Sequence, residues 1–372
     1  MTLTQVGLER LNTATTKKIG TNKNIIINGA MQVAQRGTSS TTSGLATVDR
    51  FQQIHSGTDE APTQAQVDVA SGTTPYTLGF RKAFKITNGN QTSGAGAGDY
   101  IWIQTKLEAQ DVANSGWNYL STSSYITLSF WVKSSVAQDF KGYLRSRDGT
   151  ERMYPFATGA LTADTWTKVT KTIPGNTGLQ FDNDANEGLQ LNIGCFFGTD
   201  LTNNSTTEDA WATWDSAARS KDMTSTWYTT NNATFELTGV QLEVGSVATD
   251  FEHRSFAKEF SLCQRYYQQY VNPPCTGVVP DNSSKAYSIG LVFQTRMRTT
   301  PTTTITNVGN GGNVHDGNSG ADIASLNAAD GNVNGMSIYL NLDSDLGNFR
   351  PATLGRNDST SNTTEYKFTA EL

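Results

Sequence analysis

Apolar and polar residues alternate along much of residues 25–255, a pattern that predicts β-strands with one buried face. The clearest alternating runs are Tyr125–Lys133, Trp166–Ile173 and Leu189–Cys195. Asp148-Gly149 stands between two further alternating runs and predicts a hairpin turn. Short strands at this spacing, with no helices between them, predict a β-sandwich.

The run from Phe235 to Val244 changes phase part-way along. Phe235 and Leu237 have one parity, whereas Val240 and Leu242 have the other. Because a shift of one residue turns every later side chain to the other face of a sheet, this change predicts a β-bulge near Thr238-Gly239. We interpret the run as the closing strand of the sandwich.

Two helices are predicted. The first is inserted in the sandwich: Thr206 or Thr207 caps it, Arg219 and Lys221 lie near its end, and Trp211, Trp214 and Ala218 share one face. The second occupies residues 256–270 and is ended by Pro273-Pro274.

These elements divide the chain into four parts. They are an N-terminal tether (1–24), the sandwich domain (25–255), a linker helix (256–270) and a small C-terminal β domain (271–372). In the last part, Ala286–Phe293 and Gly335–Leu342 read as strands. The predicted fold class is therefore all-β. No repeat of fixed period is present, which argues against stacked β-helix coils.

Composition and charge exclude several classes of partner. Of the 372 residues only 17% are charged, and the net charge is −6 with a pI of about 5.2. Nucleic-acid binding depends on clustered Lys and Arg, which this chain lacks. No apolar run is long enough to cross a membrane, and Met1–Gly20 lacks the organisation of a signal peptide. Three scattered cysteines predict folding in a reducing cytosol, with Cys195 in a core strand.

Several segments resemble, in order, those of phage tail-fibre and related virion proteins. They are Asn24–Gly37 (NIIINGAMQVAQRG), Val48–Phe51 (VDRF), Thr238–Glu252 (TGVQLEVGSVATDFE), Leu262–Gln268 (LCQRYYQ), Met297–Thr302 (MRTTPT) and Tyr366–Leu372 (YKFTAEL). The resemblance implies a carbohydrate-binding-like jelly roll and assembly as a homotrimer. It also implies attachment to a phage tail or adaptor protein through residues 1–24, and a host cell-surface glycan as ligand. The protein would be made in the host cytoplasm and would work in the virion, at the tail or the outer surface. A polar C-terminal segment that buries little by itself also favours a trimer.

The sequence offers no catalytic constellation. None of His55, His253 and His315 lies in a nucleophile motif, and the Asp182/Asp184 pair reads as a solvated loop. We therefore expect no enzyme activity and no cofactor.

Calcium is the metal that the sequence leaves open. Asp330, Asn332 and Asn334 match the first half of a calcium loop, but Asn341 stands where the twelfth position requires a bidentate Glu. The resemblance implies a structural calcium between the first and last strands. Gln32 stands where an acidic residue is expected there.

Aromatic residues outside the core phase of the strands are candidates for stacking on sugar rings. The first group, in and after the inserted helix, is Trp211, Trp214, Trp227 and Tyr228, and the second is Trp117 and Tyr119. The alternative, that these rings are buried against a sheet, stays open. Trp102, Trp131 and Trp166 are assigned to the sandwich itself.

Arg36, Asp49 and Arg50 are predicted to form a structural charge pair that ties the first turn to an early strand.

Three functions are compatible with these observations. The leading hypothesis is a non-catalytic tail-fibre subunit that recognises a host-surface glycan. The alternatives are a capsid decoration or head-fibre structural protein, and a capsular polysaccharide depolymerase.

Overall fold

The computed structural model describes residues 23–271, 275–280, 284–288, 290–306, 313–316, 318–347, 349–356 and 364–372. The chain divides into two compact units between Arg254 and Ser255. The predicted tether lies outside the described residues except for Lys23 and Asn24.

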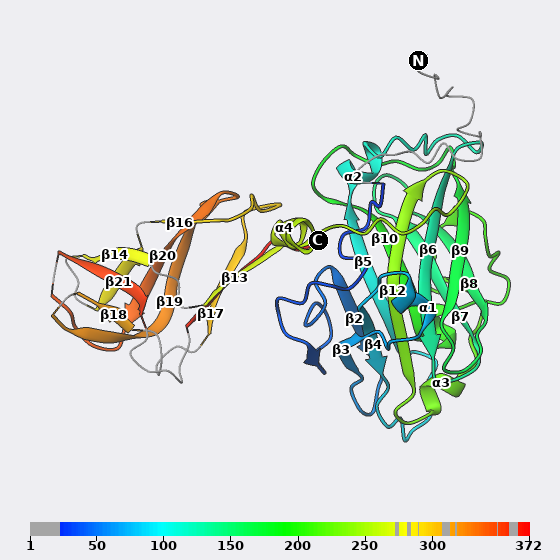
Figure 1. Cartoon of the computed structure of the whole chain (residues 1–372), viewed down its shortest axis with the longest axis horizontal. Helices are drawn as coiled ribbons and strands as arrows, with labels where there is room; N and C mark the ends of the chain where they lie inside the picture. Colours follow the sequence, from blue (N-terminus) through cyan, green and yellow to red (C-terminus); the bar gives the residue numbers. More distant parts are fainter. Residues whose placement is uncertain are drawn as a thin grey trace, which may run out of the picture. The chain divides into compact units, whose positions relative to one another are not determined.

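Unit 1 contains two six-stranded antiparallel sheets packed face to face (Figure 1). Sheet A runs in the spatial order β1 (Ser39–Ser40), β3 (Thr63–Asp68), β4 (Lys82–Thr87), β12 (Thr234–Val244), β6 (Tyr125–Ser134) and β9 (Thr167–Pro174). Sheet B runs β11 (Ala212–Thr213), β8 (Arg152–Ala160), β7 (Asp139–Ser146), β10 (Glu187–Phe197), β5 (Tyr100–Glu108) and β2 (Phe51–Ser56). Three short helices, α1 (Thr74–Thr77), α2 (Ala109–Ala113) and α3 (Thr226–Thr229), lie in the connections.

The connections make this sandwich a jelly roll. The chain crosses from one sheet to the other between β4 and β5, β5 and β6, and β6 and β7, and again between β8 and β9, β9 and β10, and β10 and β12. Neighbours in space are therefore mostly distant in sequence, and every pairing is antiparallel. The prediction of an all-β jelly-roll sandwich is confirmed.

Alternation along the strands generates the core between the sheets. On β6, Ile126, Leu128, Phe130 and Val132 are completely buried and face the other sheet. Cys195 on β10 is also buried there, and burial raises the pKa of its thiol. The predicted hairpin joins β7 and β8 around Asp148-Gly149.

The predicted bulge in β12 is confirmed, because its pairing with β6 shifts register between Thr238 and Gln241. At this point β12 also changes its other neighbour. Before the bulge, Thr234–Leu237 pair with β4. After it, the neighbour of β12 is the segment Asn24–Gly29, which we call the opening segment. Val240 N donates to Gly29 O (2.9 Å), and Ile25 N donates to Leu242 O (2.9 Å).

Asn24 fixes the opening segment to β12. Its amide nitrogen donates to Val240 O (3.0 Å), and its amide oxygen accepts from Leu242 N (3.0 Å). Asn24, which the sequence placed in the tether, is thus buried in the sandwich. Gly29 is required at the crossing, since a Cβ there would lie 2.0 Å from Val240 O.

The prediction of a helix within residues 206–221 is wrong. The segment is a loop that contains the short strand β11, and its backbone bonds to the edge strand β8: Asp209 N donates to Pro155 O and Trp214 N donates to Glu151 O. Thr206 does not cap a helix, because its hydroxyl donates to Ala218 O. Pairing with a sheet edge has overridden the helical spacing of the two tryptophans.

The described residues of unit 2 form one helix and two antiparallel sheets. The helix is α4 (Phe256–Gln264), capped by Ser255. A three-stranded sheet runs β13 (Tyr267–Val271), β22 (Glu365–Thr369) and β17 (Thr302–Thr306). A seven-stranded sheet runs β15 (Lys285–Ser288), β14 (Cys275–Val279), β21 (Arg350–Arg356), β18 (Asn313–His315), β19 (Gly320–Asn332), β20 (Gly335–Leu342) and β16 (Leu291–Val292).

Three expectations for unit 2 are corrected. The linker helix ends at Gln264 rather than 270, because Tyr267–Val271 pair with β22. The run Ala286–Phe293 forms two short strands instead of one. The segment also buries more than expected, since Val279, Ile323, Leu340 and Phe368 belong to a hydrophobic core of its own.

We predict that Gly29→Ala lowers the free energy of unfolding by about 3 kcal/mol, because the methyl group would force Gly29 away from Val240 and break the bond that closes the bulge. Gly98→Ala is the matched control, because a Cβ at Gly98 would make only an ordinary contact with Asp200 Oδ2 at 3.6 Å. It should cost no more than about 0.5 kcal/mol. Urea denaturation of the two variants checks this, and equal losses would contradict it.

Candidate functional site

The outer face of sheet B carries a row of amide side chains at one register position. Gln52, Gln104, Asn192 and Tyr143 lie opposite one another on β2, β5, β10 and β7. The Gln52 amide donates to Gln104 Oε1, and Gln104 Nε2 donates to Asn192 Oδ1 at 2.7 Å. Adjacent strands are about 4.8 Å apart, so the row spans roughly 14 Å.

The end of this amide row has an unused donor. Asn192 is fully buried, and its Nδ2 has no hydrogen-bond partner among the described residues. An unsatisfied buried donor costs about 1–3 kcal/mol. Burial raises the pKa of the neighbouring Tyr143, against the opposite effects of Arg219 and Arg145, so its phenol stays protonated and able to donate.

A second row on this face is aromatic. Tyr100 and Trp102 lie on β5 with ring centroids 4.4 Å apart, and Trp102 lies 5.7 Å from Phe197. Gly194 makes room for this row, because a Cβ there would lie 2.3 Å from the Phe197 ring. The indole N–H of Trp102 is a further buried donor with no partner in the described part of the chain.

Trp214, from the inserted loop, extends the aromatic row across β7. Its ring lies 5.6 Å from that of Tyr143, and the Arg145 guanidinium stacks over it at 3.7 Å. Arg219 lies between Trp214 and Trp102, at 5.6 Å and 5.2 Å from the two rings. Trp214 is half-buried, so one part of the ring remains accessible.

The third row is charged. Lys106 and Arg147 both bind Glu187, at 2.9 Å and 3.0 Å. Arg145 and Arg147 both bind Glu151. We call the three rows together the sheet B face. It combines apolar rings with amide and guanidinium groups, the composition that binds the apolar C–H faces and the hydroxyls of sugars.

The other proposed stacking residues do not reach this face. Trp227, Tyr228 and Trp117 are buried in the core between the sheets. Their rings cannot stack on a sugar, so the prediction that they bind glycan is wrong. Their polar atoms serve the fold: Trp227 Nε1 donates to Thr234 O at 3.0 Å, and Tyr228 Oη donates to Asp99 at 3.0 Å.

Trp211 and Tyr119 are partly buried against the same core. Trp211 Nε1 donates to Pro174 O at 2.7 Å and so anchors the inserted loop. Tyr119 packs edge-on against Phe181 at 5.0 Å. Of the six candidates, Trp214 alone lies on the sheet B face.

Sequence reasoning missed most of the sheet B face. Trp102 was assigned to the sandwich itself, but Ile101 and Ile103 face the core, and Trp102 therefore faces outward. Trp131 and Trp166 likewise pack on the outside of sheet A. Strand parity was the available signal, since each tryptophan is out of phase with its buried neighbours. The alignment of Gln52, Gln104 and Asn192 had no sequence signal.

Asp49 is buried beside the first turn. Its carboxylate lies 3.5 Å from Arg36 Nη1 and accepts a hydrogen bond from Gln35 N at 3.0 Å. Arg50 points elsewhere and donates to Lys106 O at 2.6 Å. Asn28, with a φ of 59°, donates to Asp49 O at 2.8 Å. These groups serve the fold of the opening segment.

Asp330, Asn332 and Asn334, which the sequence left open as calcium candidates, lie in a hairpin. Asp330 and Asn332 belong to β19, which pairs with β20 from Gly335 onward, so the segment is a tight hairpin. Asn332 Oδ1 accepts from Asn334 N at 2.8 Å, as in an ordinary Asx turn. Among the described residues, no group of three or more His, Cys, Asp or Glu side chains is placed to hold a metal.

The oxygens between the opening segment and the end of β12 do not fit the structural calcium that the jelly-roll resemblance implied. Lys23 Nζ donates to Asp250 O and to the Thr249 hydroxyl. Arg254 donates to the carbonyls of Asn24 and Ile26, and it lies 3.2 Å from Glu252. Two cationic side chains thus already bind the oxygens that a cation would need.

Comparisons with known proteins give structural likeness only. No family model matches the sequence, and no curated protein matches it. Among solved structures, the chain is similar to the enzymatically active domain of tailspike protein 4 of bacteriophage CBA120 (11% identity, TM-score 0.32), covering 60% of this chain and 22% of that one.

Two carbohydrate-binding structures are also similar. The N-terminal cellulose-binding domain of Cellulomonas fimi β-1,4-glucanase C has 11% identity and a TM-score of 0.27, covering 58% of this chain and 99% of that one. The tandem CBM22-1–CBM22-2 domain of Paenibacillus barcinonensis Xyn10C has 11% identity and a TM-score of 0.28, covering 94% of this chain and 90% of that one. Because these TM-scores are below 0.5, the fold assignment rests on the strand order.

No helix in the described ranges is long and apolar enough to cross a bilayer.

We predict that calcium does not stabilise unit 1 and that Arg254→Met lowers the free energy of unfolding by about 3 kcal/mol. The substitution leaves Glu252 and two carbonyl groups without their cation, and the Arg254 side chain is only 5% exposed. Lys82→Met is the control, since Lys82 binds Asp68 on the surface. It should lower the free energy of unfolding by no more than about 0.5 kcal/mol.

Thermal unfolding with a chelator and with added CaCl2 checks the first part. A rise in Tm with CaCl2 that the chelator reverses would contradict it.

Proposed function

We propose that this chain is a non-catalytic, glycan-recognising subunit of a phage virion, most specifically a tail fibre. The sheet B face is the observation that supports glycan recognition. It places accessible parts of Gln52, Tyr100 and Trp214 beside the guanidinium groups of Arg145 and Arg219. The virion assignment is supported by the tail-fibre resemblance of the opening, closing and linker segments.

The sheet B face suits a chain of sugars better than a single ring. The row of three amides crosses β2, β5 and β10 and ends at Tyr143 on β7, and the aromatic row runs beside it from β5 to the inserted loop. A ligand that lies along both rows would stack its apolar faces on Trp214 and Tyr100. Its hydroxyls would then bond to Gln52 and to Arg219, both of which are partly exposed.

The carboxylates on this face support a binding role rather than hydrolysis. Glycoside hydrolysis needs one protonated and one ionised acid across the sugar bond. Glu151 and Glu187 are each bound by two basic side chains and serve to hold Arg145, Arg147 and Lys106 in place. Release of reducing ends from bacterial polysaccharides by the purified protein would contradict this part of the proposal.

Assembly and attachment belong to the same proposal. The subunit would form a homotrimer, carried in the virion by a tail or adaptor protein that binds residues 1–24. A mass of one 40.3 kDa chain in light scattering would contradict the trimer.

We predict that Trp214→Ala weakens binding of the full chain to immobilised bacterial surface polysaccharides about tenfold, because the platform under Arg145 is lost. Trp166→Ala is the matched control: Trp166 is also a half-buried tryptophan beneath a basic side chain, Lys133 at 5.2 Å, but it lies on sheet A. Polysaccharide arrays, read beside circular dichroism, check this. A folded Trp214→Ala protein that binds as well as the unchanged protein would remove the sheet B face from the proposal.

A further inference from the structure

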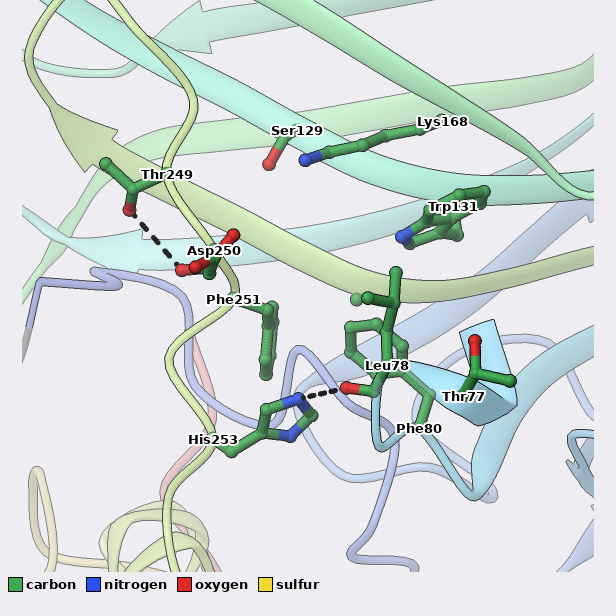
Figure 2. A pocket seen from close by; sticks show the side chains of 11 residues that line it. Thr77, Leu78, Phe80, Ser129, Trp131, Lys168, Thr249, Asp250, Phe251 and His253 are labelled. Atoms are coloured by element: carbon green, nitrogen blue, oxygen red, sulfur yellow. Dashed lines mark hydrogen bonds between the residues drawn. The ribbon is translucent and has the colours of Figure 1, made fainter. Parts of the chain in front are cut away.

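The opposite side of unit 1 has a pocket of its own. It has a volume of about 340 Å³ and lies on the outer face of sheet A (Figure 2). Its walls come from β6, β9, the bulge of β12, the turn after α1 and the segment 249–253. We call it the sheet A pocket. The residues that line it are Thr77, Leu78, Phe80, Ser129, Trp131, Lys168, Gly239, Thr249, Asp250, Phe251 and His253.

The bulge makes the floor of this pocket. Gly239 has a φ of +62°, and a Cβ there would lie 2.7 Å from the Phe80 ring and 3.2 Å from Trp131 Cδ1. Only a glycine allows both rings to approach the strand so closely. Trp131, opposite Lys168 on β9, stays half-buried and keeps part of its ring open to the pocket.

One end of the pocket is closed by aromatic rings. Phe80 and Phe251 meet edge to face at 4.9 Å, and His253 packs on both, at 5.1 Å and 5.0 Å. His253 Nε2 donates to Leu78 O at 2.8 Å, which joins the two walls (Figure 2). The rings bound the pocket on this side, and a volume of about 340 Å³ suits one sugar ring better than a chain.

Three donors in the pocket have no hydrogen-bond partner in the described part of the chain. They are the Ser129 hydroxyl, the Trp131 indole N–H and the Lys168 ammonium. Ser129 is 4% exposed, and the part of it that is accessible lines the pocket. In Figure 2 the Lys168 side chain runs along the pocket toward Ser129. Asp250, on the opposite wall, supplies a carboxylate whose charge offsets that of Lys168.

We propose that the sheet A pocket is a second carbohydrate site, which takes the terminal, uncharged residue of a glycan. Its volume is at the small end for ligand pockets, which fits one ring. Trp131 and Phe251 face the apolar side of that ring. The three donors form hydrogen bonds to its oxygens, and the Asp250 carboxylate accepts a hydrogen bond from one of its hydroxyl groups. This inference does not depend on the sheet B face, which takes the length of a chain.

The test is saturation-transfer NMR of the full chain with a panel of methyl glycosides of neutral hexoses and N-acetylhexosamines. We expect at least one of them to bind saturably. Trp131→Ala should weaken that binding about tenfold, and Lys168→Gln and Ser129→Ala about three- to tenfold each. Ser129→Ala removes one oxygen and keeps the strand intact, which covers the case in which Trp131→Ala does not fold.

Trp214→Ala separates the two sites. It should leave methyl glycoside binding unchanged while it weakens polysaccharide binding. Trp131→Ala should instead weaken the binding of the methyl glycosides. Absence of binding by every methyl glycoside would overturn the sheet A proposal. So would binding that the three sheet A substitutions leave unchanged, or binding of acetate and phosphate in place of the neutral sugars.

Discussion

The hydrogen bonds between the bulge of β12 and the segment Asn24–Gly29 are the constraint on which the rest of unit 1 depends. A bulge leaves backbone groups without ladder partners, and in the middle of a sheet these must be satisfied. Here Gly29 and Asn24 provide the partners for Val240 and Leu242. The opening segment thereby replaces β4 beside the second half of β12. Its own loop is held by Asn28 and by the buried Asp49.

The same bulge makes the outer face of sheet A different in shape from that of sheet B. Sheet B is paired across β2, β5, β10 and β7, so side chains at one register position form straight rows. Most of those side chains are buried, and Gln52, Tyr100 and Trp214 are among those that stay partly exposed. Sheet A is interrupted at Gly239, where Phe80 and Trp131 close in on the strand. That interruption makes the hollow of the sheet A pocket. One jelly roll thus carries two outer surfaces of different shape.

The inserted loop and the linker helix show how tertiary pairing overrides local preference. Trp211 and Trp214 have helical spacing, but the edge of β8 offers backbone partners, and Pro174 O and Arg145 offer sites for the two side chains. Tyr267 continues the apolar stripe of α4, yet it enters a strand because β22, about a hundred residues later in the chain, pairs with it. A helix of nine residues gains little from propensity alone, so such partners decide its end.

The sequence by itself determined several central strands of unit 1, the parity change that marks the bulge, and the all-β class, because each depends on a local alternation of apolar and polar residues. It also contained the signal for Trp102 and Trp131, which are out of phase with buried neighbours. Only the tertiary structure decided which rings are accessible, since Trp227, Tyr228 and Trp117 have no local pattern that distinguishes them from Trp214. It also decided the row of Gln52, Gln104 and Asn192 and the approach of His253 to Leu78, because register and crossover connections bring together residues that are 52 to 175 positions apart.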